Sequence, residues 1–164
     1  MQAFEKEDLC CEVIRVGILG TNCYVCYNKS TKEGCVIDPG GEVDKIMAFI
    51  NSKEIKVQRI YLTHGHFDHI GGIKNDNDAK VLMHKDDLEW VSQVNTYLPM
   101  IGMPSMEIPI IDDYINDGDI WGANTFLKYF YVDYIPTEID EYMKKTIEKG
   151  KVIGTNPKIG KSIK

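Results

Sequence analysis

The 164-residue sequence lacks a long hydrophobic run and an excess of basic residues. No stretch of about eighteen consecutive apolar residues occurs, so we expect no membrane-spanning helix. The formal net charge is −6. This charge argues against nucleic acid as a partner, because phosphate binding requires a basic surface. Residues 1–8 are polar and acidic, unlike a signal peptide, and we therefore expect a cytoplasmic protein.

Cysteines are few and odd in number, which predicts reduced thiols rather than a framework of disulfides. They are Cys10, Cys11, Cys23, Cys26 and Cys35. The C-x-x-C spacing of Cys23 and Cys26 is also found in zinc and redox sites. Residues 22–27 have the composition of a strand, however, and residues three apart on a strand point to opposite faces. We therefore interpret both as buried strand residues.

Histidine is also scarce, with four in the chain and none after His84. The other three lie together with an aspartate in the run His64-Gly65-His66-Phe67-Asp68-His69. Imidazole nitrogens and carboxylate oxygens are common ligands of zinc. In an extended loop, His64 and His66 project to the same side and can converge on one ion, while Asp68 and His69 can face a second. The predicted metal ligands are His64, His66, Asp68 and His69, and Asp68 is also the candidate catalytic residue.

Strand and helix patterns alternate along the chain, which predicts an α/β layered domain. Strands are expected at residues 12–18, 22–27, 35–37, 57–62 and 80–83, and helices at 43–50 and 85–94. The first helix carries apolar residues at the i, i+3, i+4, i+7 spacing of a buried stripe. The irregular segment 97–109 contains three methionines and either lies over the mouth of the site or packs its methionines against the core.

The run Thr63–Gly72 resembles the metal-binding signature of the metallo-β-lactamase superfamily. Residues 20–25 and 36–41 resemble the opening strands of its glyoxalase II-like branch. This resemblance extends from about Val13 to about Lys128 and implies an αββα sandwich. We expect one domain, with a metallo-β-lactamase-like region over residues 1–128. Residues 129–164 diverge and predict a helix and a basic tail, so the second half of the sandwich is incomplete or remodelled.

The resemblance implies thioester or ester hydrolysis by metal-bound hydroxide, with one or two zinc ions as cofactor and iron or manganese as alternatives. His64 and His66 would bind one metal, and Asp68 and His69 the other. Asp38 matches a family acid that orients a ligand histidine from behind it. An Asx turn or a helix cap explains Asp38 equally well.

The complete family site has three further ligands in the C-terminal half: a histidine in a Pro-Gly-His loop, a bridging aspartate and a final histidine. This chain has no histidine after His84, which we interpret as a helix-start or packing residue. Asp119 lies in a turn, and Asp133 is the only polar residue near the expected position. Each metal would keep two protein ligands, whereas catalytic zinc normally has three.

Two functions follow. The chain is an active hydrolase of a small (thio)ester that obtains the missing ligands elsewhere, or it is a truncated or remodelled relative that binds metal weakly and is not an efficient enzyme. The second explains the missing histidines better. A mononuclear iron oxygenase of the persulfide dioxygenase type is a third alternative, but it also requires a distal histidine. A shortened second half would expose an apolar sheet face near residues 129–132, which a homodimer would cover.

Overall fold

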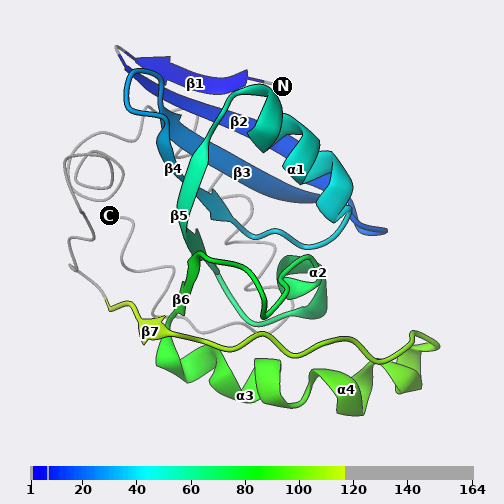
Figure 1. The fold of residues 1–164 in the computed structure, drawn as a ribbon. Coiled ribbons are helices and arrows are strands. Elements are labelled where there is room, and N and C mark those ends of the chain that lie inside the picture. Colours follow the sequence, from blue (N-terminus) through cyan, green and yellow to red (C-terminus); the bar gives the residue numbers. More distant parts are fainter. Residues whose placement is uncertain (1, 7, 117–164) are drawn as a thin grey trace.

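A computed structural model of the chain describes residues 2–6 and 8–116 (Figure 1). Several sequence-based expectations lie outside the described residues. These are the turn at Asp119, the strand at 129–132, the position of Asp133, and the helix and basic tail of the C-terminal segment. No described helix is long and apolar enough to cross a membrane.

The described strands form one sheet whose spatial order follows the sequence. They are β1 (Gln2–Lys6), β2 (Leu9–Val16), β3 (Thr21–Asn28), β4 (Glu33–Ile37), β5 (Lys56–Tyr61), β6 (Lys80–Met83) and β7 (Asp113–Tyr114). Strands β1 to β4 pair antiparallel, and β4 to β7 pair parallel. The five predicted strands are present within a few residues of their expected bounds. Strands β1 and β7 were not predicted, because β1 has a polar sequence and β7 is only two residues long.

The helical segments connect the parallel strands (Figure 1). They are α1 (Val43–Ser52), α2 (Phe67–Ile70), the 3-10 turn η1 (Lys85–Asp87), α3 (Leu88–Ser92), α4 (Val94–Tyr97) and the 3-10 turn η2 (Pro99–Ile101). Helix α1 confirms the expected stripe in part: Ile46 and Ile50 are buried, whereas Met47, on the same stripe, is 44% exposed. The single helix expected at 85–94 is wrong: a 3-10 turn opens the segment, and Gln93 ends α3 and begins α4.

The sheet has two apolar faces, as alternation along β3 requires. Cys23 and Val25 belong to the larger core that also contains the buried residues of α1. Tyr24 and Cys26 belong to a second cluster, together with residues of β2, β4, β5 and β6. The interpretation of the C-x-x-C pair as buried strand residues on opposite faces is therefore confirmed. The described residues supply one sheet and one helix layer of the expected sandwich.

The segment after α4 contributes to the core in part. Met103 and Met106 are partly buried against the larger core, as the packing interpretation expects. Met100 is instead 81% exposed.

Candidate metal centre

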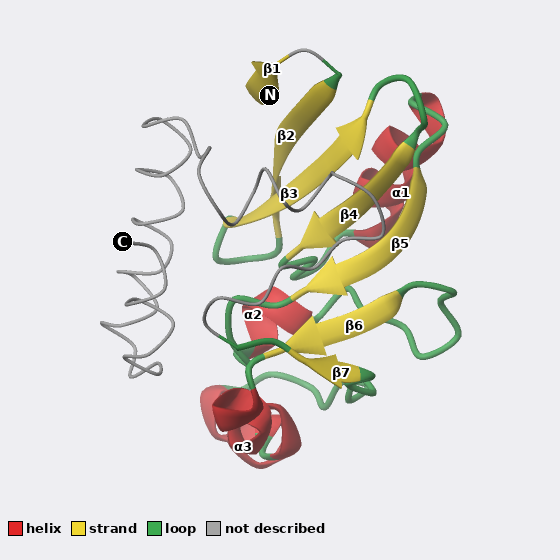
Figure 2. Cartoon of the chain, turned by 90° about the vertical axis from the view of Figure 1, so that its left-hand side faces the viewer, coloured by secondary structure: helices red, strands yellow, loops and turns green. Residues whose placement is uncertain are grey.

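The predicted ligands lie in the loop after β5 and in α2, which Figure 2 shows beside the carboxyl ends of the central parallel strands. Asp38 follows β4, and its backbone N–H donates to the Tyr61 carbonyl at 3.0 Å. Leu62 follows β5, and its N–H donates to the Leu82 carbonyl at 2.9 Å. These bonds align the ends of β4, β5 and β6. The carboxyl edge of parallel strands is where open α/β sheets generally hold their functional residues.

The loop after β4 packs directly on the backbone of α2, and glycines make this approach possible. A Cβ built on Gly40 would lie 1.6 Å from the Asp68 carbonyl oxygen, and one on Gly72 would lie 2.4 Å from the Pro39 carbonyl oxygen. The Gly72 N–H donates to that Pro39 oxygen at 2.7 Å. Only glycine, which has no Cβ, allows the two backbones to come this close. The loop after β4 and α2 are therefore in direct backbone contact.

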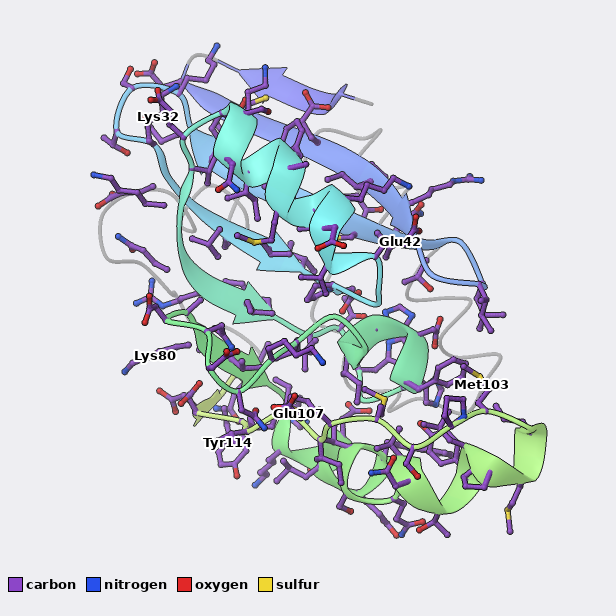
Figure 3. All side chains as sticks on the ribbon, turned by 45° about the vertical axis from the view of Figure 1, so that its right-hand side comes forward. Lys32, Glu42, Lys80, Met103, Glu107 and Tyr114 are labelled. Carbon is purple, nitrogen blue, oxygen red and sulfur yellow. The ribbon has the colours of Figure 1, made fainter. Side chains whose placement is uncertain are left out.

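A second connection ties the β2–β3 turn to the start of α1. The Gly17 N–H donates to Glu42 Oε2 at 3.0 Å, and Figure 3 shows Glu42 between this turn and the helix. Glu42 is also the N-cap of α1, so Asp38 is not the cap of that helix.

Asp38 lies fully buried behind the histidine cluster. Its Oδ1 accepts the Thr63 backbone N–H at 2.8 Å, and its Oδ2 accepts the Thr63 hydroxyl at 2.7 Å. The same Oδ2 lies 3.0 Å from Nδ1 of His69, an electrostatic contact rather than an aligned hydrogen bond. Burial alone would raise the pKa of Asp38, but His69, His64 and the Thr63 hydroxyl outweigh it and hold the pKa below its usual value.

The Thr63 hydroxyl sets the tautomer of His64. Its single proton goes to Asp38, so its oxygen must accept the proton of His64 Nδ1, which lies 3.0 Å away. The lone pair of His64 is thereby placed on Nε2, which is buried and has no hydrogen-bond partner among the described residues. Burial, followed by repulsion from His69, lowers the pKa of His64 to about 3, so the ring is neutral at pH 7.

His69 and Asp68 face each other at the start of α2. The Thr21 hydroxyl donates to Asp68 Oδ2 at 2.7 Å, and Nε2 of His69 lies 3.4 Å from the same oxygen. Burial would lower the pKa of His69, but the Asp38 and Asp68 carboxylates outweigh it and raise that pKa. The Asp38 and Asp68 carboxylates therefore stabilise a positive charge at this position, whether it is a proton on His69 or a metal ion.

The three histidine rings are buried and adjacent. The ring of His64 lies 4.6 Å from that of His66 and 3.9 Å from that of His69, between centroids. Burial lowers the pKa of His66, whose ring packs edge-on against Trp90 at 4.9 Å. The structure thus brings all four predicted ligand residues together with Asp38.

The donor atoms of the cluster are of the types that bind metal ions, but the described residues supply too few of them for a complete site. Within residues 8–116, His64 Nε2 is a buried lone pair without a partner, and imidazole with carboxylate is a donor set that zinc and iron both accept. No group of three or more His, Cys, Asp and Glu side chains within residues 8–116 is arranged to hold a metal. Additional ligands would have to come from outside the described residues.

Apart from Asp38, sequence reasoning missed the residues that support the cluster. Thr63 and Thr21 each direct one of the predicted ligands, and the only available signal was that Thr63 precedes the histidine run. Asp87 is 1% exposed beneath Gly65, and burial raises its pKa to about 6, partly offset by the Gly65 N–H and by His84. His84 is the N-cap of η1, accepting the Asp86 N–H at 3.3 Å, which confirms its interpretation as a helix-start residue.

Residues 16–96, which contain this cluster, match the family model of the metallo-beta-lactamase superfamily. This part of the chain belongs to the metallo-beta-lactamase superfamily. The chain is 30% identical to a hydroxyacylglutathione hydrolase of Pelagibacter ubique over 113 residues, which cover 66% of this chain and 40% of that enzyme. The chain spans about half the length of the curated relatives that it matches.

Solved structures give the same fold. The B3 metallo-beta-lactamase BLEG-1 is 28% identical with a TM-score of 0.57, over 65% of this chain and 53% of that one. TTHA1623 in a di-iron-bound form is 24% identical with a TM-score of 0.58, over 70% of this chain and 57% of that one. The mixed sheet with its helix layer is therefore a metallo-beta-lactamase fold over the described residues.

Proposed function

We propose that the His64–His69 cluster is one half of the metal site of a glyoxalase II-like hydrolase that acts on a small thioester or ester. The observation that carries this proposal is the buried Nε2 of His64, which no group in the described part of the chain hydrogen-bonds. A buried polar atom without a partner is costly unless a ligand satisfies it. Zinc is the proposed ion, with iron or manganese as alternatives.

In this proposal His64 and His66 hold one ion, and Asp68 and His69 hold the other position. A bound ion would supply Lewis acidity, activating water and polarising the substrate carbonyl. Asp38 and Thr63 keep the proton of His64 on Nδ1 and leave Nε2 free to bind. Thr21 fixes the Asp68 carboxylate, the proposed catalytic residue, and Trp90 limits the movement of His66.

A second candidate is a protein that binds metal weakly and does not turn over substrate. The absence of a three-donor group within residues 8–116 favours it, as does the lack of any histidine after His84. Two ligands in place of three weaken binding, at about 1.4 kcal/mol for each tenfold in affinity. A homodimer that supplies further donors is the proposed partner arrangement in which the first candidate stays active.

Hydrolysis of a hydroxyacylglutathione thioester by the zinc-supplemented chain distinguishes the two candidates. The first predicts turnover that His66→Ala abolishes and His84→Ala preserves. Zinc binding without turnover supports the second candidate. Turnover that survives His66→Ala contradicts the first, because the reaction would then not depend on the cluster.

A further inference from the structure

Three cysteines lie in one row across the face of the sheet opposite α1. In the pairing registers, Cys11 of β2 stands opposite Cys26 of β3, and Cys26 stands opposite Cys35 of β4. Figure 2 shows these three strands side by side. All three thiols belong to the second apolar cluster and are at most 2% exposed. The remaining cysteines, Cys10 and Cys23, lie in the core on the other face.

The central thiol is close to bonding distance from one neighbour. The Sγ atoms of Cys11 and Cys26 are 2.6 Å apart, and both cysteines are free thiols. Residues directly opposite in antiparallel strands have Cα atoms about 4.5 to 5.5 Å apart. This spacing lies within the range of about 4.4 to 6.8 Å that disulfides require. The backbone can therefore accept a Cys11–Cys26 bond without moving its strands apart.

The row does not suit a metal ion. Cys11 and Cys35 are two strand spacings apart, which is about 9.5 Å, because neighbouring strands lie about 4.7 to 4.9 Å apart. Three thiolates around zinc each need a bond of about 2.3 Å, so a straight row cannot supply all three. The described residues accordingly contain no group of three such side chains arranged for a metal.

We propose that Cys26 is an oxidation site, which forms a cross-strand disulfide with Cys11 when the protein meets a small peroxide, and that Cys35 takes the place of Cys11 where Cys11 is absent. The Cys26 thiol reduces hydrogen peroxide and becomes a sulfenic acid, with release of water. The Cys11 thiol then attacks the oxidised sulfur of Cys26, which forms the S–S bond and releases a second water. Two thiols are oxidised, and one peroxide is reduced.

Burial shapes this reactivity. It raises the pKa of Cys26 far above its usual value, and the flanking Cys11 and Cys35 thiols raise it further. Large thiol reagents should therefore react slowly with the folded protein. Once a small oxidant has modified one sulfur, the adjacent thiol is already within reach, and proximity makes the second step fast. The expected product is the disulfide rather than sulfinic acid.

The test uses the full chain carrying Cys10→Ser and Cys23→Ser, which leaves only the three cysteines of the row. This variant is treated with hydrogen peroxide and unfolded in the presence of N-ethylmaleimide, and its intact mass is measured. We expect one maleimide per chain instead of three, and a proteolytic fragment in which Cys11 is linked to Cys26. The oxidised protein should also unfold at a temperature several degrees higher, because the link constrains the unfolded chain.

Adding Cys26→Ser should restore full maleimide labelling, and adding Cys11→Ser should redirect the link to Cys35. If Cys26→Ser does not fold, Cys26→Ala serves instead. Any of four results would overturn the proposal. They are three maleimides per chain after treatment, a Cys11–Cys35 link, a predominant Cys26–Cys35 link while Cys11 is present, and oxygen added without crosslinking.

Discussion

A single hydroxyl proton decides which nitrogen of His64 is available to a ligand. Thr63 gives that proton to Asp38 and accepts from His64 Nδ1, so Nε2 is left as a buried lone pair. At the scale of one residue, the proposed metal site therefore depends on a threonine that would bind no metal itself.

We expect Thr63→Val to weaken zinc binding by about tenfold to a hundredfold, the usual effect of losing a group that orients a ligand. Valine keeps the shape and the backbone N–H to Asp38 but removes the hydroxyl. Thr63→Ser, which retains the hydroxyl, is the matched control and should bind like the native protein. Competition for zinc against a chelator measures both affinities. Equal affinities for the valine and serine variants would contradict the assigned role of Thr63.

Asp87 should make stability depend on pH in a definite direction. Its folded pKa is raised from 3.8 to about 6, so the folded state binds the proton more tightly than the unfolded chain. The stability from this group is fully present below about pH 4 and is lost as pH rises through about 6. Asp87→Asn cannot ionise and should be more stable than the native protein at pH 8, by on the order of 2 kcal/mol.

Urea unfolding at pH 4.5 and pH 8 measures this difference, which should shrink toward the lower pH. Asp76→Asn is the control, because Asp76 is exposed in the loop before β6, and this variant is expected to unfold like the native protein at both pH values. A gain for Asp87→Asn that is the same at both pH values would show that ionisation is not the cause.

At the scale of elements, the strongest local patterns in the sequence gave correct expectations. The apolar spacing of α1, the alternation along β3 and the short strand β6 could all be predicted, because each depends on neighbouring residues. The break within the helical segment after β6 could not, since it depends on how α3 packs beneath the loop that carries His64 and His66. Within the part of the chain that the structure describes, strand β7 is defined by its pairing with β6, a contact that no local pattern encodes.

The contact between the loop after β4 and α2 predicts a sharp difference between adjacent glycines. Gly40→Ala should lower the free energy of unfolding by about 3 kcal/mol, because the new methyl group would overlap the Asp68 carbonyl oxygen. Gly41→Ala is the matched control: its Cβ would meet only Gly17, at ordinary contact distance. That substitution should change stability by less than about 1 kcal/mol. Similar losses for the two variants in urea unfolding would refute this interlock.

At the scale of the whole molecule, the described half of the sandwich gathers the predicted ligands but not a complete donor set. The motif could be read from sequence because its residues are consecutive. Asp38 could be predicted through the family resemblance. Thr21 and Asp87 could not, because they reach the cluster from segments separate from the motif. Because the motif residues are consecutive, a chain that spans about half the length of its relatives can still preserve the geometry of this loop.

The central claim is that the His64–His69 cluster binds a metal ion, and equilibrium dialysis against zinc tests it most directly. We predict that the native chain retains zinc, that His64→Ala and His69→Ala lose most of it, and that His84→Ala, whose histidine lies outside the cluster, retains as much as the native chain. A native chain that retains no zinc, or a His64→Ala variant that retains the native amount, would contradict the account.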